Sequence, residues 1–211
     1  MAGPADRVSD GPEDEGGVPA DPAQFPPYDV LSTERIYDSS WIALRRDELA
    51  LPGGGTQEYH VVEIGDAVCV LPVTSTGEVV LIGQHRHPHG DTHWEAPAGR
   101  VEEGEDPAAG ALRELREETG YEAAEVRSLP GFYPINGISA HWVHLYAATG
   151  CELRHEQDLD PSERIIVRTF TWAECEALLR AGKIKDGLTA LALMYGRWLL
   201  GEDAAPTEPR S

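Results

Sequence analysis

Basic residues are scarce in this sequence. Its 211 residues include 17 lysines and arginines but 37 aspartates and glutamates, which gives a net charge of −20 at pH 7. So strong a negative charge repels nucleic acid and anionic membrane surfaces, and we expect neither as a partner. A ligand that carries phosphate would have to be held by bound cations and a few well-placed arginines.

Cysteines and long apolar runs are scarce too. The three cysteines, Cys69, Cys151 and Cys175, are far apart and odd in number, so they predict neither a disulfide framework nor a pair of zinc ligands. Buried free thiols in a reducing compartment are the expected state. No stretch has the pattern of a signal peptide, and none approaches the length of a membrane span. These absences predict a cytoplasmic protein.

Four parts of the chain differ in composition. Residues 1–27 hold six prolines and four glycines among acids and alanines, a composition that cannot form a packed core. Strands expected at 33–37, 40–49 and 56–64 form a meander that can hardly bury a core without a neighbour or a second subunit. We therefore expect a disordered tail at 1–29, an antiparallel meander at 30–64, a main domain at 65–200 and a second loose tail at 201–211.

The main domain mixes strands and helices. Two nearly continuous apolar runs, 66–73 and 78–85, predict central strands that are buried on both faces. The pattern then predicts a polar loop at 87–92, a strand and its bend at 124–133, a strand at 142–149, an acidic loop at 153–164, a strand at 165–170, and helices from 172 to about 180 and from 188 to 200. This order predicts an α/β (α+β) fold built in layers.

One helix of the main domain is unusually acidic. Asp106 followed by Pro107 is typical of a helix start, and Gly120 of a helix end. The residues available for its inner face are Ala108, Leu112 and Leu115. Gly110, in the middle of the helix, costs about 1 kcal/mol relative to alanine.

Three glutamates, Glu114, Glu117 and Glu118, share one patch of this helix because they are spaced i, i+3 and i+4. Like charges at these spacings repel each other, so a helix built only for stability would avoid the arrangement. A bound divalent cation would offset the repulsion between the carboxylates, since Mg²⁺ prefers carboxylate oxygens and substrate phosphates as ligands. A solvated charged face is the alternative interpretation of the glutamates alone.

The surrounding residues decide between these interpretations. The stretch 99–121, GRVEEGEDPAAGALRELREETGY, resembles the Nudix hydrolase signature G-x5-E-x7-R-E-U-x-E-E-x-G-U. The matching residues are Gly99, Glu105, Arg113, Glu114, Leu115, Glu117, Glu118 and Gly120, with Tyr121 in the last apolar position. The resemblance implies a mixed β-sheet sandwiched between α-helices and an enzyme that hydrolyses a nucleoside diphosphate linked to another moiety.

The resemblance also implies a metal site. Glu114 and Glu118 would bind Mg²⁺, or Mn²⁺ in its place, and Glu117 would be a further ligand or hold a bound water. The backbone carbonyl of Ala98 would complete the ligand set. Arg113 would orient the glutamates, while Glu105 is expected to be a structural residue.

Flanking motifs favour one branch of the family. Gln84–Pro88 (QHRHP), Trp94–Gly99 (WEAPAG) and Gly182–Ile184 (GKI) resemble the ADP-ribose pyrophosphatase branch. The implied substrate is a nucleoside diphosphate sugar, with ADP-ribose first, and the implied assembly is a homodimer that exchanges its N-terminal meanders. A pyrophosphatase for another nucleotide sugar such as GDP-mannose, or a Nudix sensor that binds ADP-ribose without cutting it, is the alternative.

The branch also implies the catalytic base and the substrate contacts. Glu163, at the end of the acidic loop, would take the proton of the attacking water; Glu156, Asp160 or a merely solvated acid are the alternatives. The expected substrate-binding residues are Arg86 as a phosphate clamp, Trp41 and Tyr59 as base-stacking aromatics, and Gly99. Arg86 could instead be an ordinary surface arginine, and Trp41 could instead be a tryptophan buried in the meander.

Two features depart from the pattern or compete with it. Where the branch has Ser-Pro-Gly, this chain has Ile135-Asn136-Gly137, and His141 replaces an acid that often follows; both changes bear on specificity rather than on chemistry. The histidines His85, His87, His89 and His93 invite a metal interpretation. Because Mg²⁺ prefers oxygen ligands, we do not expect them to form the metal site.

Overall fold

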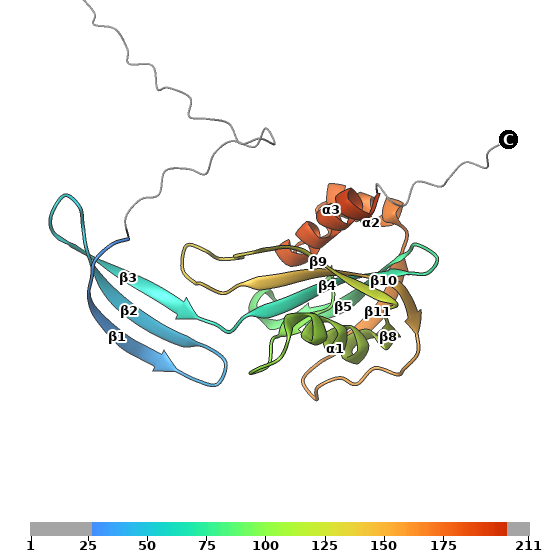
Figure 1. Ribbon diagram of the computed structural model, residues 1–211, viewed down its shortest axis with the longest axis horizontal. Coiled ribbons are helices and arrows are strands. Elements are labelled where there is room, and N and C mark those ends of the chain that lie inside the picture. Colours follow the sequence, from blue (N-terminus) through green and yellow to red (C-terminus); the bar gives the residue numbers. More distant parts are fainter. Residues whose placement is uncertain (1–26, 202–211) are drawn as a thin grey trace, which may run out of the picture. The chain divides into compact units, whose positions relative to one another are not determined.

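The computed structural model describes residues 27–201, in two sheets and three α-helices (Figure 1). The tails expected at 1–29 and 201–211 fall outside the described residues, apart from 27–29 and Gly201. None of the described helices is long and apolar enough to cross a membrane.

The meander is present as a three-stranded sheet. Its strands, in the order β1-β2-β3, are β1 (Val30–Asp38), β2 (Ala43–Ala50) and β3 (Thr56–Glu63). The part that ends at Thr33 and spans Asp47–Tyr59 forms a compact unit of its own, while the rest of the sheet belongs to the main unit. Every residue of β1 is exposed in the single chain, including the apolar Val30, Leu31 and Ile36.

The main sheet has eight strands among the described residues. Its central path runs β11-β5-β4-β10-β8, and β6, β7 and β9 pair with β5, β4 and β10. The strands are β4 (Ala67–Thr74), β5 (Val79–Arg86), β6 (Asp91–Glu95), β7 (Ala98–Arg100), β8 (Tyr121–Glu122), β9 (Glu125–Phe132), β10 (Val143–Leu153) and β11 (Ile165–Phe170). Among the described strands of this sheet, β4 and β10 pair in parallel and the other pairs are antiparallel, so the sheet is mixed, as predicted.

Helices cover both faces of this sheet (Figure 1). Helix α1 (Pro107–Thr119) packs on one face through Ala111 and Leu115, against Val68 and Val70 of β4. Helices α2 (Trp172–Arg180) and α3 (Gly187–Gly201) pack on the other face, where Leu71 and Leu81 join the larger apolar cluster. Because side chains alternate along a strand, β4 and β5 are buried on both faces, which explains their nearly continuous apolar sequences.

The helix boundaries follow the expected signals. Asp106 accepts a hydrogen bond from the backbone N–H of Ala109, Pro107 is the first residue of α1, and Gly120 ends it with φ of 75°. Thr171 and Glu174 form the predicted capping box at the start of α2. Cys69, Cys151 and Cys175 are free and buried, as expected.

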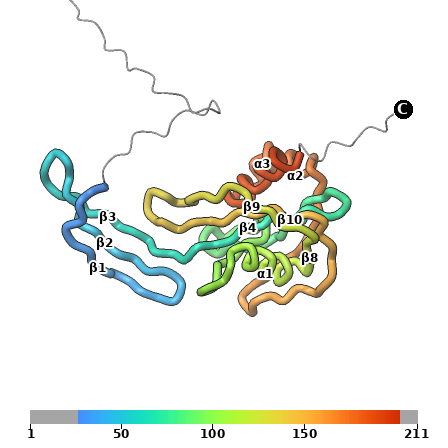
Figure 2. Tube along the Cα trace, viewed as in Figure 1, coloured from blue at the N-terminus to red at the C-terminus, as the bar shows by residue number. Residues whose placement is uncertain are grey.

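Several details differ from the sequence predictions. The expected polar loop at 87–92 contains a 3-10 turn, His87–His89, and the start of β6, because pairing with β5 extends the strand to Asp91. β9 is one strand rather than a strand and a bend, and β10 continues to Leu153. The two paired strands run side by side in the chain trace (Figure 2). Leu112 is exposed, so the inner face of α1 is formed by Gly110, Ala111 and Leu115 instead.

Candidate active site

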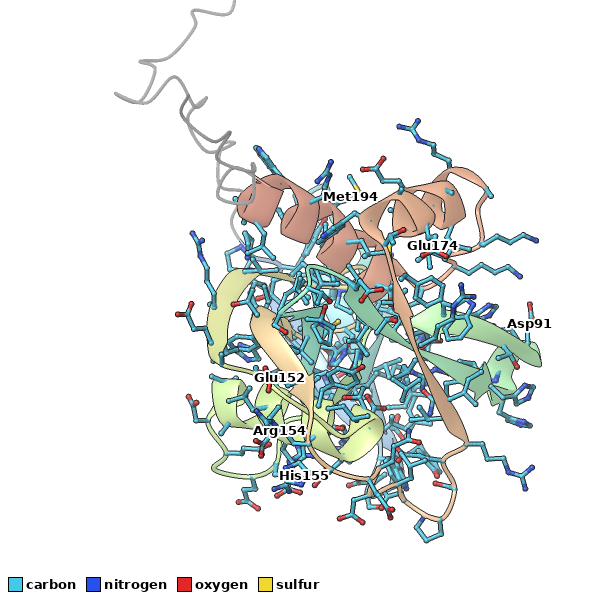
Figure 3. All side chains as sticks on the ribbon, turned by 90° about the vertical axis from the view of Figure 1, so that its right-hand side faces the viewer. Asp91, Glu152, Arg154, His155, Glu174 and Met194 are labelled. Carbon is cyan, nitrogen blue, oxygen red and sulfur yellow. The ribbon has the colours of Figure 1, made fainter. Side chains whose placement is uncertain are left out.

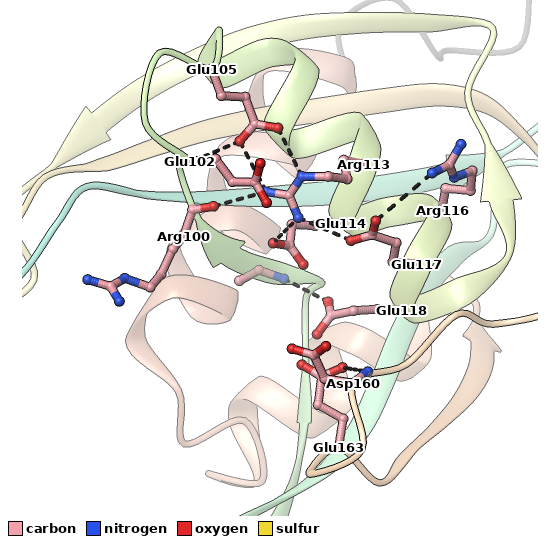
Figure 4. Close-up of polar contacts among 11 residues, drawn as sticks. Arg100, Glu102, Glu105, Arg113, Glu114, Arg116, Glu117, Glu118, Asp160 and Glu163 are labelled. Atoms are coloured by element: carbon pink, nitrogen blue, oxygen red, sulfur yellow. Dashed lines mark hydrogen bonds and ion pairs between the residues drawn. The ribbon is translucent and has the colours of Figure 1, made fainter. Parts of the chain in front are cut away.

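Arg113 is the hub of the acidic helix (Figure 4). Its guanidinium donates hydrogen bonds to Glu114 Oε1 (2.8 Å) and Glu117 Oε2 (3.1 Å), and to both carboxylate oxygens of Glu105 (2.9 and 3.1 Å). A further bond reaches the backbone carbonyl of Arg100 (3.0 Å). The pKa of Arg113 is raised, first by the hydrogen bond with Glu105, and the pKa of Glu105 is lowered by the same bond. Arg113 thus fixes the directions of two glutamates on α1.

Two glycines make room for these carboxylates. A Cβ atom at Gly99 would lie 1.9 Å from Glu114 Oε1, so only glycine lets this side chain reach across β7. A Cβ atom at Gly110 would lie 2.8 Å from Glu105 Oε2. The helix therefore tolerates a glycine in its middle because Glu105 must approach its surface to reach Arg113.

Glu118 is the most deeply buried of the helix glutamates, with 3% of its surface exposed. Its Oε2 accepts a hydrogen bond from the backbone N–H of Ala98 (3.0 Å). Burial and then the charge of Glu114 raise the pKa of Glu118 to about 8, despite the Ala98 bond and Arg86, which oppose the shift. Burial also raises the pKa of Glu114. Two acids are thus held together where their charges are costly.

The segment between β10 and β11 brings a fourth acid to this place (Figure 4). Glu163 is close enough for its charge to raise the pKa of both Glu114 and Glu118. Its carboxylate accepts the backbone N–H of Asp160 (3.0 Å), and its own N–H donates to the Asp160 carbonyl (2.9 Å). Glu163 is therefore held by a local turn and lies beside the glutamates of α1.

The same segment is tied to the C-terminal end of α1. Gln157 donates from its side chain to the carbonyl of Glu118 (2.5 Å), and the N–H of Asp158 donates to the carbonyl of Glu117 (2.9 Å). The carbonyl of Gly120 accepts from Arg154 and His155, both at 3.0 Å. These bonds satisfy carbonyls that a helix end leaves without partners. The helix that carries the glutamates and the segment that carries Glu163 are therefore joined by hydrogen bonds.

The oxygen atoms present fit a hard divalent cation. Glu114 Oε2 and Glu118 Oε1 have no hydrogen-bond partner within residues 27–201, and carboxylate oxygens are the donors that Mg²⁺ prefers. Within the same residues, no three acidic, histidine or cysteine side chains already converge on one point. The same nitrogen of Arg113 holds one oxygen of Glu117 and one of Glu114.

Arg86, the expected phosphate clamp, lies at the end of β5 and is partly exposed. Its Nε and Nη2 donate to the carboxylate of Glu95, at distances from 2.5 to 3.2 Å. Burial tends to lower the pKa of Arg86, but Glu95 outweighs burial and raises it. The charge of Arg86 also acts on Glu118, so the two side chains face the same region.

The two expected base-stacking aromatics belong to different units. Trp41 is 69% exposed, which contradicts the interpretation as a buried tryptophan for the single chain. The Arg100 guanidinium lies 5.4 Å from the centre of its ring and donates to its carbonyl (3.1 Å). Tyr59 is on β3 in the smaller unit.

The four histidines lie around the β5–β6 hairpin. His89 and His93 stack with ring centres 4.6 Å apart, and their Nε2 atoms are 2.7 Å apart, so one ring donates to the other. His93 is buried, while the other three are at least partly exposed.

Sequence reasoning missed Glu95 and Gln157 as parts of this site. In the sequence, Glu95 is one residue of the WEAPAG motif. A single acid among apolar residues indicates that its carboxylate is buried and has a polar or charged partner. Gln157 offered no signal, because its contact with Glu118 depends on how a long segment folds back onto α1.

Two family models match this chain. The NUDIX domain model matches residues 63–192, and the model of the nucleoside diphosphate sugar hydrolase N-terminal domain matches residues 28–62. A methanol dehydrogenase activator of Bacillus methanolicus and an ADP-ribose pyrophosphatase of Bacillus subtilis (strain 168) are each 34% identical over 167 residues, 79% of this chain and 90% of the relative.

A solved structure shares the fold. The crystal structure of an ADP compounds hydrolase superposes with a TM-score of 0.76 over 87% of this chain and 99% of that one, at 18% identity. The chain therefore belongs to the Nudix hydrolase family.

Proposed function

We propose that this protein is a Mg²⁺-dependent pyrophosphatase that hydrolyses ADP-ribose to AMP and ribose 5-phosphate. The observation that carries the proposal is that Glu163 lies close enough to Glu114 and Glu118 for its charge to raise the pKa of both. The match of residues 28–62 to a nucleoside diphosphate sugar hydrolase domain and the similarity to an ADP-ribose pyrophosphatase support the substrate class.

Glu114 and Glu118, with the carbonyl of Ala98 and with Glu117 as a further ligand, would hold the divalent cation. When bound, the cation would neutralise charge on the diphosphate and favour the attack of water. Arg86 would bind a phosphate oxygen through the N–H groups that Glu95 leaves free. Arg113 would keep the glutamates in their orientations.

Glu163 would act as the general base. It takes one proton from the attacking water while the water oxygen bonds to one phosphorus. The bond between that phosphorus and the bridging oxygen breaks, and the bridging oxygen leaves with the other phosphate. Glu156 and Asp160, on the same segment, are the alternative bases. Glu163 is favoured over them because its charge raises the pKa of both Glu114 and Glu118.

The test is an assay of purified protein with Mg²⁺ and ADP-ribose, with AMP release as the readout. Replacing Glu163 by Gln should lower kcat about 100-fold or more while the Mg²⁺ dependence is kept, because only proton transfer is lost. Glu156→Gln and Asp160→Asn, which keep the segment intact, should remain within a few-fold of wild type. A normal rate for Glu163→Gln would remove it as the base.

Substrate choice is tested in the same assay. Release of GMP from GDP-mannose without release of AMP from ADP-ribose would move the substrate and keep the chemistry. Binding of ADP-ribose without any cleavage would instead favour a sensor. If either result is found, Ile135–Gly137 and His141 are the first residues to examine, because they depart from the pattern of the branch at positions that bear on specificity. His141 Nδ1 lies 2.7 Å from the backbone carbonyl oxygen of Gly65.

The proposed assembly is a homodimer through the N-terminal meander. The exposed apolar residues of β1, Val30, Leu31 and Ile36, support it, because a partner would remove them from water. The match of residues 28–62 to a domain of its own supports a dedicated role for this part. The domain boundaries and the cytoplasmic location stay predictions.

A further inference from the structure

The buried carboxylate of Glu95 requires an explanation beyond the metal site. Glu95 is 4% exposed, at the end of β6, and its main charged partner is Arg86 on the neighbouring strand. Removing a carboxylate from water is costly, and a buried ion pair is often no more stabilising than apolar side chains of the same size. Stability alone therefore does not account for an acid at this position.

The register of the strands shows how the pair forms. Glu95 lies opposite Ile82, and Arg86 lies opposite Asp91, so Glu95 sits four residues before Arg86 along β5. Residues an even number apart share one face of a strand, so Glu95 and Arg86 project from the same face. The arginine side chain must therefore bend back along the strand to reach Glu95, and the carboxylate fixes it there through Nε and Nη2.

The geometry leaves part of the guanidinium available. A guanidinium has five N–H groups, and Glu95 uses those on Nε and one on Nη2. The remaining three have no hydrogen-bond partner within the part of the chain that the structure describes. They belong to a side chain that is 40% exposed and whose charge acts on Glu118. A planar donor pair near the glutamates suits two oxygens of a phosphate.

We propose that Glu95 is a positioning residue, which holds the Arg86 guanidinium at a fixed orientation for the diphosphate of the substrate. The proposal rests on the proposed function, since it names the part of that site that binds phosphate. Glu95 itself touches neither the cation nor the diphosphate. Glu95 orders the flexible side chain of Arg86 before the substrate binds, so that substrate binding does not have to provide the free energy for this ordering.

The test measures binding of ADP with Mg²⁺ by isothermal titration calorimetry, together with kcat and KM for ADP-ribose. Glu95→Gln keeps the shape but removes the charge and one acceptor, and should weaken ADP binding about 10- to 100-fold. KM should rise by a similar factor, with a smaller change in kcat and an unchanged Mg²⁺ dependence. Because Glu95 acts through Arg86, Arg86→Ala and the double variant should be equally weak, which is the non-additivity of a coupled pair.

Asp91→Asn is the matched control. It makes the same carboxylate-to-amide change on the same strand and breaks the ion pair with Lys185 (2.8 Å), but Asp91 points away from the body of the protein (Figure 3). ADP binding by this variant should stay within about two-fold of wild type. If Glu95→Gln does not fold, Arg86→Lys, which keeps the charge but lacks the planar fork, should weaken ADP binding instead.

The outcomes separate this inference from the proposed function. Wild-type affinity in Glu95→Gln, or additive losses in the double variant, would overturn the positioning role. Absence of ADP binding by the wild-type protein would also overturn the positioning role of Glu95. Coupled losses of ADP binding in a protein that does not cleave ADP-ribose would support the positioning of Arg86 and contradict the substrate.

Discussion

At the scale of single residues, Glu118 carries the largest conflict between stability and function. It is almost fully buried, its charged form is disfavoured by burial and by Glu114, and its pKa is raised to about 8. A buried carboxyl of this kind is a cost to the folded protein unless a cation compensates it. Such a cost is typical of active sites, where a residue is kept for chemistry.

The pH dependence of stability follows from this shift. Between the ordinary value of 4.5 and about 8, the folded state keeps a proton on Glu118 that the unfolded state has released. In a chelator, the contribution of this group to stability is therefore fully present below about pH 4.5 and is lost as the pH rises through 8. Added Mg²⁺ should reverse the loss, because it favours the charged form.

Replacing Glu118 by Gln should therefore stabilise the metal-free protein while it abolishes turnover. At pH 8 in a chelator, the free energy of unfolding should rise by on the order of 1–3 kcal/mol, and near pH 4, below the ordinary pKa of a glutamate, it should match wild type. Thermal unfolding across this pH range is the measurement. The exposed Glu103→Gln should show no such trend, and a Glu118→Gln variant less stable than wild type at pH 8 would refute the assignment.

At the scale of elements, helix α1 is held by contacts at its middle and at its C-terminal end. Its middle lies over Gly99 of β7, where Glu114 passes, and its C-terminal end is bound by the segment 154–158. Gly120 has two reasons to be glycine: its φ of 75°, and the His155 carbonyl 2.2 Å from where a Cβ atom would lie. The Nudix glycines thus mark close approaches between elements.

Gly99→Ala tests this interpretation of β7. The added methyl group would displace Glu114, so kcat should fall about 100-fold or more while the fold is retained. Gly187→Ala, at the start of α3 where no atom lies within 4 Å of the added methyl, should leave kcat unchanged. The measurements are steady-state kcat and circular dichroism of both variants. A wild-type kcat for Gly99→Ala would show that Glu114 can be displaced without a loss of activity.

At the scale of the whole molecule, the exposed apolar residues raise the question of assembly. One group lies on β1 of the meander, and another, Met194 and Trp198, lies on α3. Figure 3 shows Met194 on this helix. The first group is continuous with a sheet that is too small to bury a core by itself. We therefore expect the meander to form the dimer interface.

Light scattering after size-exclusion chromatography should give about 46 kDa, twice the chain mass of 23.0 kDa. Ile36→Glu should shift the protein toward the monomer, because a buried charge without a partner is costly at an interface. Met194→Glu is the matched change on α3 and should leave the dimer intact. Dissociation by Met194→Glu alone would place the interface on α2 and α3.

Local signals in the sequence were sufficient for several features of this protein. Asp106, Pro107 and Gly120 fixed the ends of α1, because caps depend on neighbouring residues, and the capping box at Thr171 did the same for α2. The unbroken apolar runs of β4 and β5 predicted their burial on both faces. The spacing of the glutamates predicted a shared helix surface, and the motif indicated the Nudix family.

Only the tertiary structure decided which residues from distant segments meet. The pairing of Arg86 with Glu95 depends on strand register, the bond of Gln157 to Glu118 on the path of a long segment, and the need for Gly110 on the approach of Glu105. The exposure of Leu112 likewise depends on how α1 is rotated against the sheet. Caps and periodicity are set by local backbone geometry, whereas contacts of this kind arise only when separate elements pack together.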